Sequence, residues 1–218
     1  MDSDDLTAAL PLERRLALSY APGSARAATL ALFAFENALE TLLRTTREPL
    51  LGQLRLAWWR DELVKPAPTR ARGEPVLAAL ATFDDAAGSL QVLVDGYEAL
   101  LGEAPLSATT FGEFTAARGE SCALLAHAVG AAAAADQARE AGMQWALSDL
   151  GIRISDPREQ AVVQSLADAC NWRDVPLPRS LRPLRVLNGL AIRTRGKAPL
   201  LARRRDMLTA FRLGLLGI

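Results

Sequence analysis

Cysteine and histidine are scarce in this chain of 218 residues, which has two cysteines, Cys122 and Cys170, and one histidine, His127. Two cysteines form neither a disulfide framework nor a zinc-binding pattern, so we expect a reducing compartment. His127 has no second metal ligand within reach by spacing, and we interpret it as a structural residue. The sequence therefore excludes small disulfide-rich scaffolds and zinc domains.

Long hydrophobic runs and leader-like segments are also missing. The longest uncharged stretch, residues 121–135, is rich in alanine and has 15 residues, whereas a membrane-spanning helix needs about 20. The acidic first residues lack the basic and then apolar pattern of a signal peptide. We expect a cytoplasmic protein, with peripheral contact at the inner membrane as an open alternative.

Strand formers are sparse, while alanine and leucine dominate the 50% of residues that are hydrophobic. No alternating pattern of useful length indicates a strand, and no fixed-period repeat is present. The sequence predicts one all-α domain over residues 1–218. Helices are predicted at residues 10–18, 24–45, 48–63, 75–83, 86–101, 110–129, 131–150, 158–171, 184–195 and 199–215.

The formal net charge is zero, but the basic residues gather toward the C-terminus. From Trp172 onward there are eleven basic residues against two acidic ones, Asp174 and Asp206. Such a segment can dock on anionic lipid or on an acidic protein surface. The alternative is that these arginines lie on solvated helix faces. We do not expect nucleic acid as a partner.

The most specific motif is EPLLGQLRLAWWRDEL at residues 48–63. With LALFAF at residues 30–35 and VDGYE at residues 94–98, it resembles the squalene/phytoene synthase family, over about residues 8–155. The remaining part matches weakly, and it looks shortened beside active members. The resemblance implies an isoprenoid-synthase-type bundle of antiparallel helices around a central apolar cavity. It also implies two facing Asp-rich motifs that hold Mg²⁺ for prenyl diphosphates.

Both Asp-rich motifs depart from the family pattern in this chain. Where the first should fall, Glu40 is followed four residues later by Arg44, and where the second should fall, Asp149 is followed by Arg153. A guanidinium is always charged and repels a divalent cation. We therefore expect no metal and no cofactor, and Mg²⁺ only if the chain is a divergent synthase. The departures indicate a degenerate clamp.

Several residues keep two interpretations. Glu36 and Glu40, one helical turn apart, could bind one Mg²⁺, or Glu40 pairs with Arg44 while Glu36 is solvated. One of the adjacent tryptophans should lie in the core and the other at a groove or an interface. The candidates for a cavity or ligand site, or for structural ion pairs, are Arg55, Trp58, Trp59, Arg60, Asp61, Asp95 and Glu98.

Two hypotheses of function follow, from different classes. The first is a non-catalytic assembly or binding factor, similar to the mitochondrial complex I assembly factor 6 group, with a membrane or respiratory protein as partner and a lipid or isoprenoid as ligand. The second is a divergent bacterial prenyltransferase of terpenoid or carotenoid biosynthesis. A helical subunit that stabilises a related synthase is a further alternative.

Overall fold

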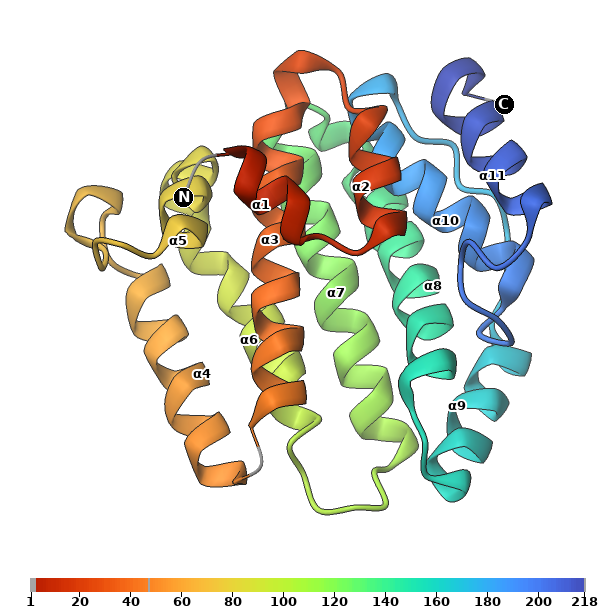
Figure 1. Ribbon diagram of the computed structural model, residues 1–218, viewed down its shortest axis with the longest axis horizontal. Helices are drawn as coiled ribbons and strands as arrows, with labels where there is room; N and C mark the ends of the chain where they lie inside the picture. The colour runs from red at the N-terminus through yellow and green to blue at the C-terminus, as the bar shows by residue number, and fades with distance from the viewer. Residues whose placement is uncertain (1–2, 47, 218) are drawn as a thin grey trace.

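The computed structural model describes residues 3–46 and 48–217, apart from the side chains of residues 84 and 85, and this part of the chain is helical without strands (Figure 1). The all-α prediction is confirmed. The helices are α1 (Ser3–Ala9), α2 (Leu12–Ser19), α3 (Gly23–Thr45), α4 (Pro49–Leu63), α5 (Pro75–Ala79), α6 (Gln91–Ala99), α7 (Ala108–Ala128), α8 (Ala135–Arg153), α9 (Pro157–Ala169), α10 (Arg182–Thr194) and α11 (Arg204–Phe211).

Local chemistry explains several of these boundaries. Pro49 occupies the first turn of α4, where its missing N–H leaves no hydrogen bond unmade. The Asp156 carboxylate accepts hydrogen bonds from the backbone N–H groups of Arg158 and Glu159 and so caps α9. Ser107 caps α7 in the same way through the N–H of Thr110. These signals are local, which is why sequence alone places these helices well.

Three segments differ from the predicted pattern. The structure adds α1, which precedes the first predicted helix at residues 10–18 and carries Asp4 and Asp5 in its first turn. Between α5 and α6 the chain forms a tight 3₁₀ segment, Leu80–Leu90. Helix α8 continues through Gly151 to Arg153, where a turn was expected. This extension places Arg153 one helical turn beyond Asp149, on the same face.

Helices α3, α6, α7 and α8 form the middle of the bundle, with α4 on one side and α9 to α11 on the other (Figure 1). Short connections make α6, α7 and α8 successively antiparallel. The α7–α8 contact is close, because a Cβ at Gly142 would lie 2.7 Å from Cys122 Sγ and 3.1 Å from Gly119 Cα. Cys122 is therefore a fully buried part of this contact.

No single helix within residues 3–46 and 48–217 is long and apolar enough to cross a membrane. One pair, Pro75–Phe83 with Ala86–Ala99, passes that test together by length and composition, but its two halves meet at 115°.

Candidate functional site

Six charged side chains from four helices meet inside the bundle, and we call them the ion cluster. They are Arg14 of α2, Glu36 and Glu40 of α3, Arg118 of α7, and Asp149 and Arg153 of α8. Three arginines face three carboxylates, so the cluster is formally neutral. All except Arg153 have side chains that are at most 11% exposed.

Arg118 is the centre of the ion cluster. Its Nη1 donates to Asp149 Oδ2 at 3.0 Å, and its Nη2 lies 3.2 Å from Glu40 Oε1. Its Nε lies 3.1 Å from Glu36 Oε1. The same Nη2 donates to the Tyr97 hydroxyl at 2.9 Å, and that hydroxyl donates to Glu40 Oε1. One guanidinium therefore contacts all three carboxylates.

The other two arginines of the ion cluster, Arg14 and Arg153, pair with the same carboxylates. Arg14 donates through Nη2 to Glu40, and the same atom lies 3.6 Å from Glu36 Oε2. Arg153 donates through Nε to Asp149 Oδ1 at 2.8 Å, and its Nη2 lies 3.2 Å from Glu40 Oε2. Glu40 and Asp149 are thus joined through arginines on both of their oxygens.

Aromatic rings support the buried guanidinium groups. The Trp145 ring centroid lies 4.6 Å from the Arg118 Cζ and 5.2 Å from the Arg14 Cζ. Phe114 lies 4.9 Å from Arg118 Cζ. A ring face attracts a cation most strongly where both are desolvated, so these rings favour arginine in the bundle interior.

Burial and pairing shift the pKa values of the ion cluster in different directions. Burial raises the pKa of Glu36, and the nearby Arg118 and Arg14 offset this only in part. Neither Glu36 oxygen accepts a hydrogen bond from the described residues. Burial also opposes ionisation of Asp149, but Arg118 and Arg153 outweigh it and leave its pKa lowered. Asp149 is the more firmly ionised of the two.

A metal ion does not fit between these carboxylates. The described residues contain no group of three or more His, Cys, Asp or Glu side chains placed to hold one, and the oxygens of Glu40 and Asp149 already face guanidinium groups. A divalent ion about 4 Å from one guanidinium is repelled by roughly 8 kcal/mol at an effective dielectric constant near 20. The carboxylates that the resemblance assigns to a Mg²⁺ clamp thus face arginines in this structure.

A cavity of about 570 Å³ opens beside the ion cluster. Its inner end carries Glu40, Arg118 and Asp149, and the exposed Arg44 lies at its lining without an ion pair in the described chain. The rest of the wall is largely apolar, as expected, and it includes Leu43, Leu100, Leu106, Phe114, Leu150 and Ile154.

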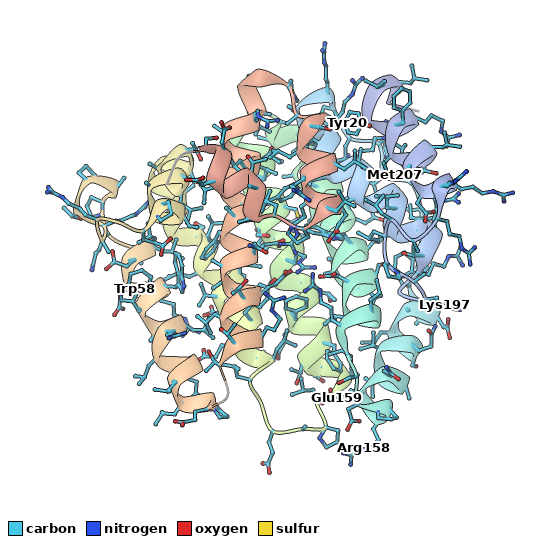
Figure 2. The ribbon with its side chains drawn as sticks, in the orientation of Figure 1. Tyr20, Trp58, Arg158, Glu159, Lys197 and Met207 are labelled. Carbon is cyan, nitrogen blue, oxygen red and sulfur yellow. The ribbon has the colours of Figure 1, made fainter. Side chains whose placement is uncertain are left out.

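A hydrogen bond joins two elements beside this cavity. The Leu106 N–H donates to the carboxylate of Glu159 at 2.8 Å, and Figure 2 labels Glu159 at the lower end of the bundle. This bond ties the loop before α7 to α9.

The expected pairing of Glu40 with Arg44 is wrong, and so is a solvated Glu36. Glu40 instead contacts Arg14, Arg118 and Arg153, and Glu36 is fully buried. The reason is tertiary packing, because α2, α7 and α8 bring three guanidinium groups to the buried face of α3. Arg44, by contrast, lies on the exposed side of α3.

Three of the candidates on α4 and α6 form a separate ion pair group. Arg60 Nε donates to Asp95 Oδ1 at 2.7 Å, and Arg60 Nη2 donates to Glu98. The Arg60 side chain is only 26% exposed, and these bonds link α4 to α6. These bonds hold α4 against α6 at the edge of the bundle, and the three residues do not line the cavity described above.

Three of the four remaining candidates line a second cavity, of about 500 Å³, between α1, α3 and α4. Arg55, Trp58 and Trp59 line it. Trp59 is buried whereas Trp58 is 38% exposed, which confirms the predicted division between core and surface. Asp61 is exposed, and the described part of the chain gives it no hydrogen bond or ion pair.

Arg14, Tyr97, Arg118 and Trp145 were not identified from the sequence, although two of them carried a signal. Arg118 lies four residues after Phe114 and four before Cys122, on the apolar face of its helix. Arg14 likewise lies four residues after Leu10 and four residues before Leu18. A lone arginine on an apolar stripe requires a buried partner, and here the partners are carboxylates of α3.

The described chain is thus an all-α bundle with a neutral ion cluster at its centre and a cavity beside it. Residues 13–116 match the sequence model of the squalene/phytoene synthase family, and the helical architecture is consistent with the isoprenoid-synthase-type fold. The matched segment contains Arg14, Glu36, Glu40 and Tyr97, and it ends two residues before Arg118. No curated protein and no solved structure matches the chain.

Proposed function

We propose that this chain is a divergent squalene/phytoene synthase-like protein that no longer ionises prenyl diphosphates and acts as a non-catalytic assembly or binding factor. The family match over residues 13–116 supports the synthase-like part. The observation that carries the non-catalytic part is that Arg118 and Arg153 occupy the oxygens of Glu40 and Asp149.

The chemical argument is one of charge. Cleavage of an allylic diphosphate needs divalent cations on the leaving group, and those cations need free carboxylate oxygens. In this chain the carboxylates neutralise guanidinium groups within the protein. The site can therefore stabilise its own fold or contact an anionic group through Arg44, whereas the oxygens of Glu40 and Asp149 face arginines instead of a metal.

The first experiment measures pyrophosphate release from farnesyl or geranylgeranyl diphosphate with Mg²⁺. We expect release at the rate of the solution without protein, and no rise in melting temperature on addition of Mg²⁺. The matched variants are Glu40→Gln in the ion cluster and Glu120→Gln, whose side chain is 42% exposed. Release that Glu40→Gln abolishes and Glu120→Gln leaves intact would contradict the proposal.

The second experiment addresses the assembly role, for which the resemblance to the complex I assembly factor group is the support. The full chain is used as bait on membranes of the source cell grown with oxygen, beside an unrelated helical bundle as control. We expect subunits of a respiratory complex in the specific fraction. Recovery of a second synthase-like chain alone would instead favour the role of a stabilising subunit.

The prenyltransferase alternative has one observation in its favour. The cavity of about 570 Å³ has an apolar wall and enough room for part of a prenyl chain. Binding of a prenyl diphosphate without pyrophosphate release would assign the cavity a ligand without assigning the chain a reaction. Release dependent on Glu40 would establish the alternative.

A further inference from the structure

The C-terminal helix exposes apolar side chains that the bundle does not use. Helix α11 continues without interruption into the π-helical turn Arg212–Leu216. Leu208 is 69% exposed and Phe211 is 57% exposed. The exposed apolar residues of this segment are Met207, Leu208, Phe211, Leu215 and Leu216, and we call them the α11 apolar face.

The opposite face of the same segment holds it to the bundle. Asp206, Ala210 and Leu213 are buried, and Asp206 accepts from the Nε of Arg193 at 3.2 Å. At Gly214 a Cβ would lie within 2.6 Å of the Tyr20 ring, so this turn packs directly on α2. The α11 apolar face therefore points outward from an anchored helix.

Unpaired cations surround the α11 apolar face. Arg204, Arg205 and Arg212 are exposed, and among the described residues none of their side chains takes part in an ion pair. Asp206 is the only acid between residues 203 and 217, and it is turned inward. The exposed side of this helix is thus apolar and positively charged, and residues 203–217 turn no acid of their own outward.

We infer that the α11 apolar face is a docking surface for an anionic lipid bilayer. Apolar side chains beside arginines on one exposed helix side suit the boundary between headgroups and acyl chains, where leucine and phenylalanine enter and the cations meet phosphate. A protein partner of matching shape would need its own acids, whereas an anionic membrane presents them everywhere. The inference is independent of the proposed function, because it uses no residue of the ion cluster.

Helix α4 offers a matched control on another side of the molecule. It also exposes leucines, with Leu54 at 60%, but its exposed charges are mixed, because Glu48 and Asp61 accompany Arg55. Figure 2 shows Trp58 of α4 and Met207 of α11 at opposite sides of the bundle. A substitution on α4 therefore tests for nonspecific hydrophobic adsorption to vesicles and leaves the α11 apolar face unchanged.

The experiment is co-sedimentation of the full chain with vesicles of phosphatidylcholine alone and of phosphatidylcholine with phosphatidylserine. We expect binding to the anionic vesicles only, weakened by salt. The triple variant Arg204→Gln, Arg205→Gln, Arg212→Gln should lower the partition coefficient about a hundredfold. The double variant Leu208→Ser, Phe211→Ser should lower it by at least about tenfold, and Leu54→Ser should leave it unchanged.

All substituted residues are exposed, so thermal melting should match that of the wild type and separate lost binding from lost folding. Equal binding to neutral vesicles, or unchanged binding by the triple variant, would overturn the inference. So would an absence of vesicle binding together with self-association that Leu208→Ser abolishes, because the face would then be an interface between copies. Pyrophosphate release does not depend on vesicles, so failure here and failure of the proposed function are separate results.

Discussion

Arg118 of α7 and Asp149 of α8 form a buried ion pair, with Nη1 3.0 Å from Oδ2. The pair links two helices that pack closely at Gly119 and Gly142. An isolated charge could not be kept there, since burial of one ion without its partner costs several kcal/mol. The ion cluster is therefore interdependent, and removal of one member leaves the others uncompensated.

Arg118→Met tests that interdependence. Methionine fills much of the same volume but leaves Glu36, Glu40 and Asp149 with fewer cations, so we expect a loss of about 3–5 kcal/mol in the free energy of unfolding. The measurement is urea unfolding followed by circular dichroism at neutral pH. As a control, Arg139→Met removes a cation that is 37% exposed and pairs with Glu120, and it should cost less than about 1 kcal/mol. Equal losses would contradict the central role of Arg118.

Glu36→Gln should change how stability depends on pH. The folded pKa of Glu36 is raised above the ordinary value of 4.5, so the folded state binds the extra proton more tightly than the unfolded state. Its contribution is favourable below the ordinary pKa and is lost as the pH rises through the folded pKa. Relative to Glu36→Gln, the wild type should lose stability as the pH rises above about 4.5. Parallel pH profiles of the two proteins would rule out this role.

Asp149→Asn should also change how stability depends on pH, but in the direction opposite to that of Glu36→Gln. The pKa of Asp149 is lowered below its ordinary value of 3.8, because Arg118 and Arg153 outweigh its burial. Its contribution is present above the ordinary pKa and is lost as the pH falls through the folded pKa. We expect Asp149→Asn to cost about 3 kcal/mol at neutral pH, with the difference from the wild type shrinking below pH 3.8. Unfolding curves at several acidic pH values check this directly, and a constant difference would contradict it.

The all-α fold could be predicted because its signals are local. Alanine and leucine favour helix wherever they occur. Local signals then mark where helices begin, such as Pro49 in the first turn of α4 and Asp156 before α9. The missed features depend on packing. Helix α8 passes through Gly151, where the sequence suggests a turn, because the packing of its neighbours outweighs the weak local preference of one glycine.

The ion cluster could be predicted only in part. The degenerate motifs singled out Glu40 and Asp149, which the structure brings together through Arg118 and Arg153. Sequence spacing cannot show that Arg14, more than twenty residues before Glu40, reaches the same point. Pairings between helices depend on the tertiary fold, whereas pairings of residues four apart are visible in the sequence and are therefore easily overestimated.

The last prediction concerns the close approach of α7 and α8, which keeps Arg118 beside Asp149. A Cβ at Gly142 would lie 2.7 Å from Cys122 Sγ and 3.0 Å from Cys122 Cβ, so Gly142→Ala must push the helices apart and should cost about 1–3 kcal/mol. Gly112→Ala is the matched control, since it lies in α7 with open space around the new methyl, and it should stabilise the protein by about 0.5–1 kcal/mol. Thermal and urea unfolding of both variants measure the difference. Because separation of the helices also stretches the Arg118–Asp149 pair, Gly142→Ala combined with Asp149→Asn should cost less than the sum of the two single changes, whereas strict additivity would show that the glycine contact and the ion pair are independent.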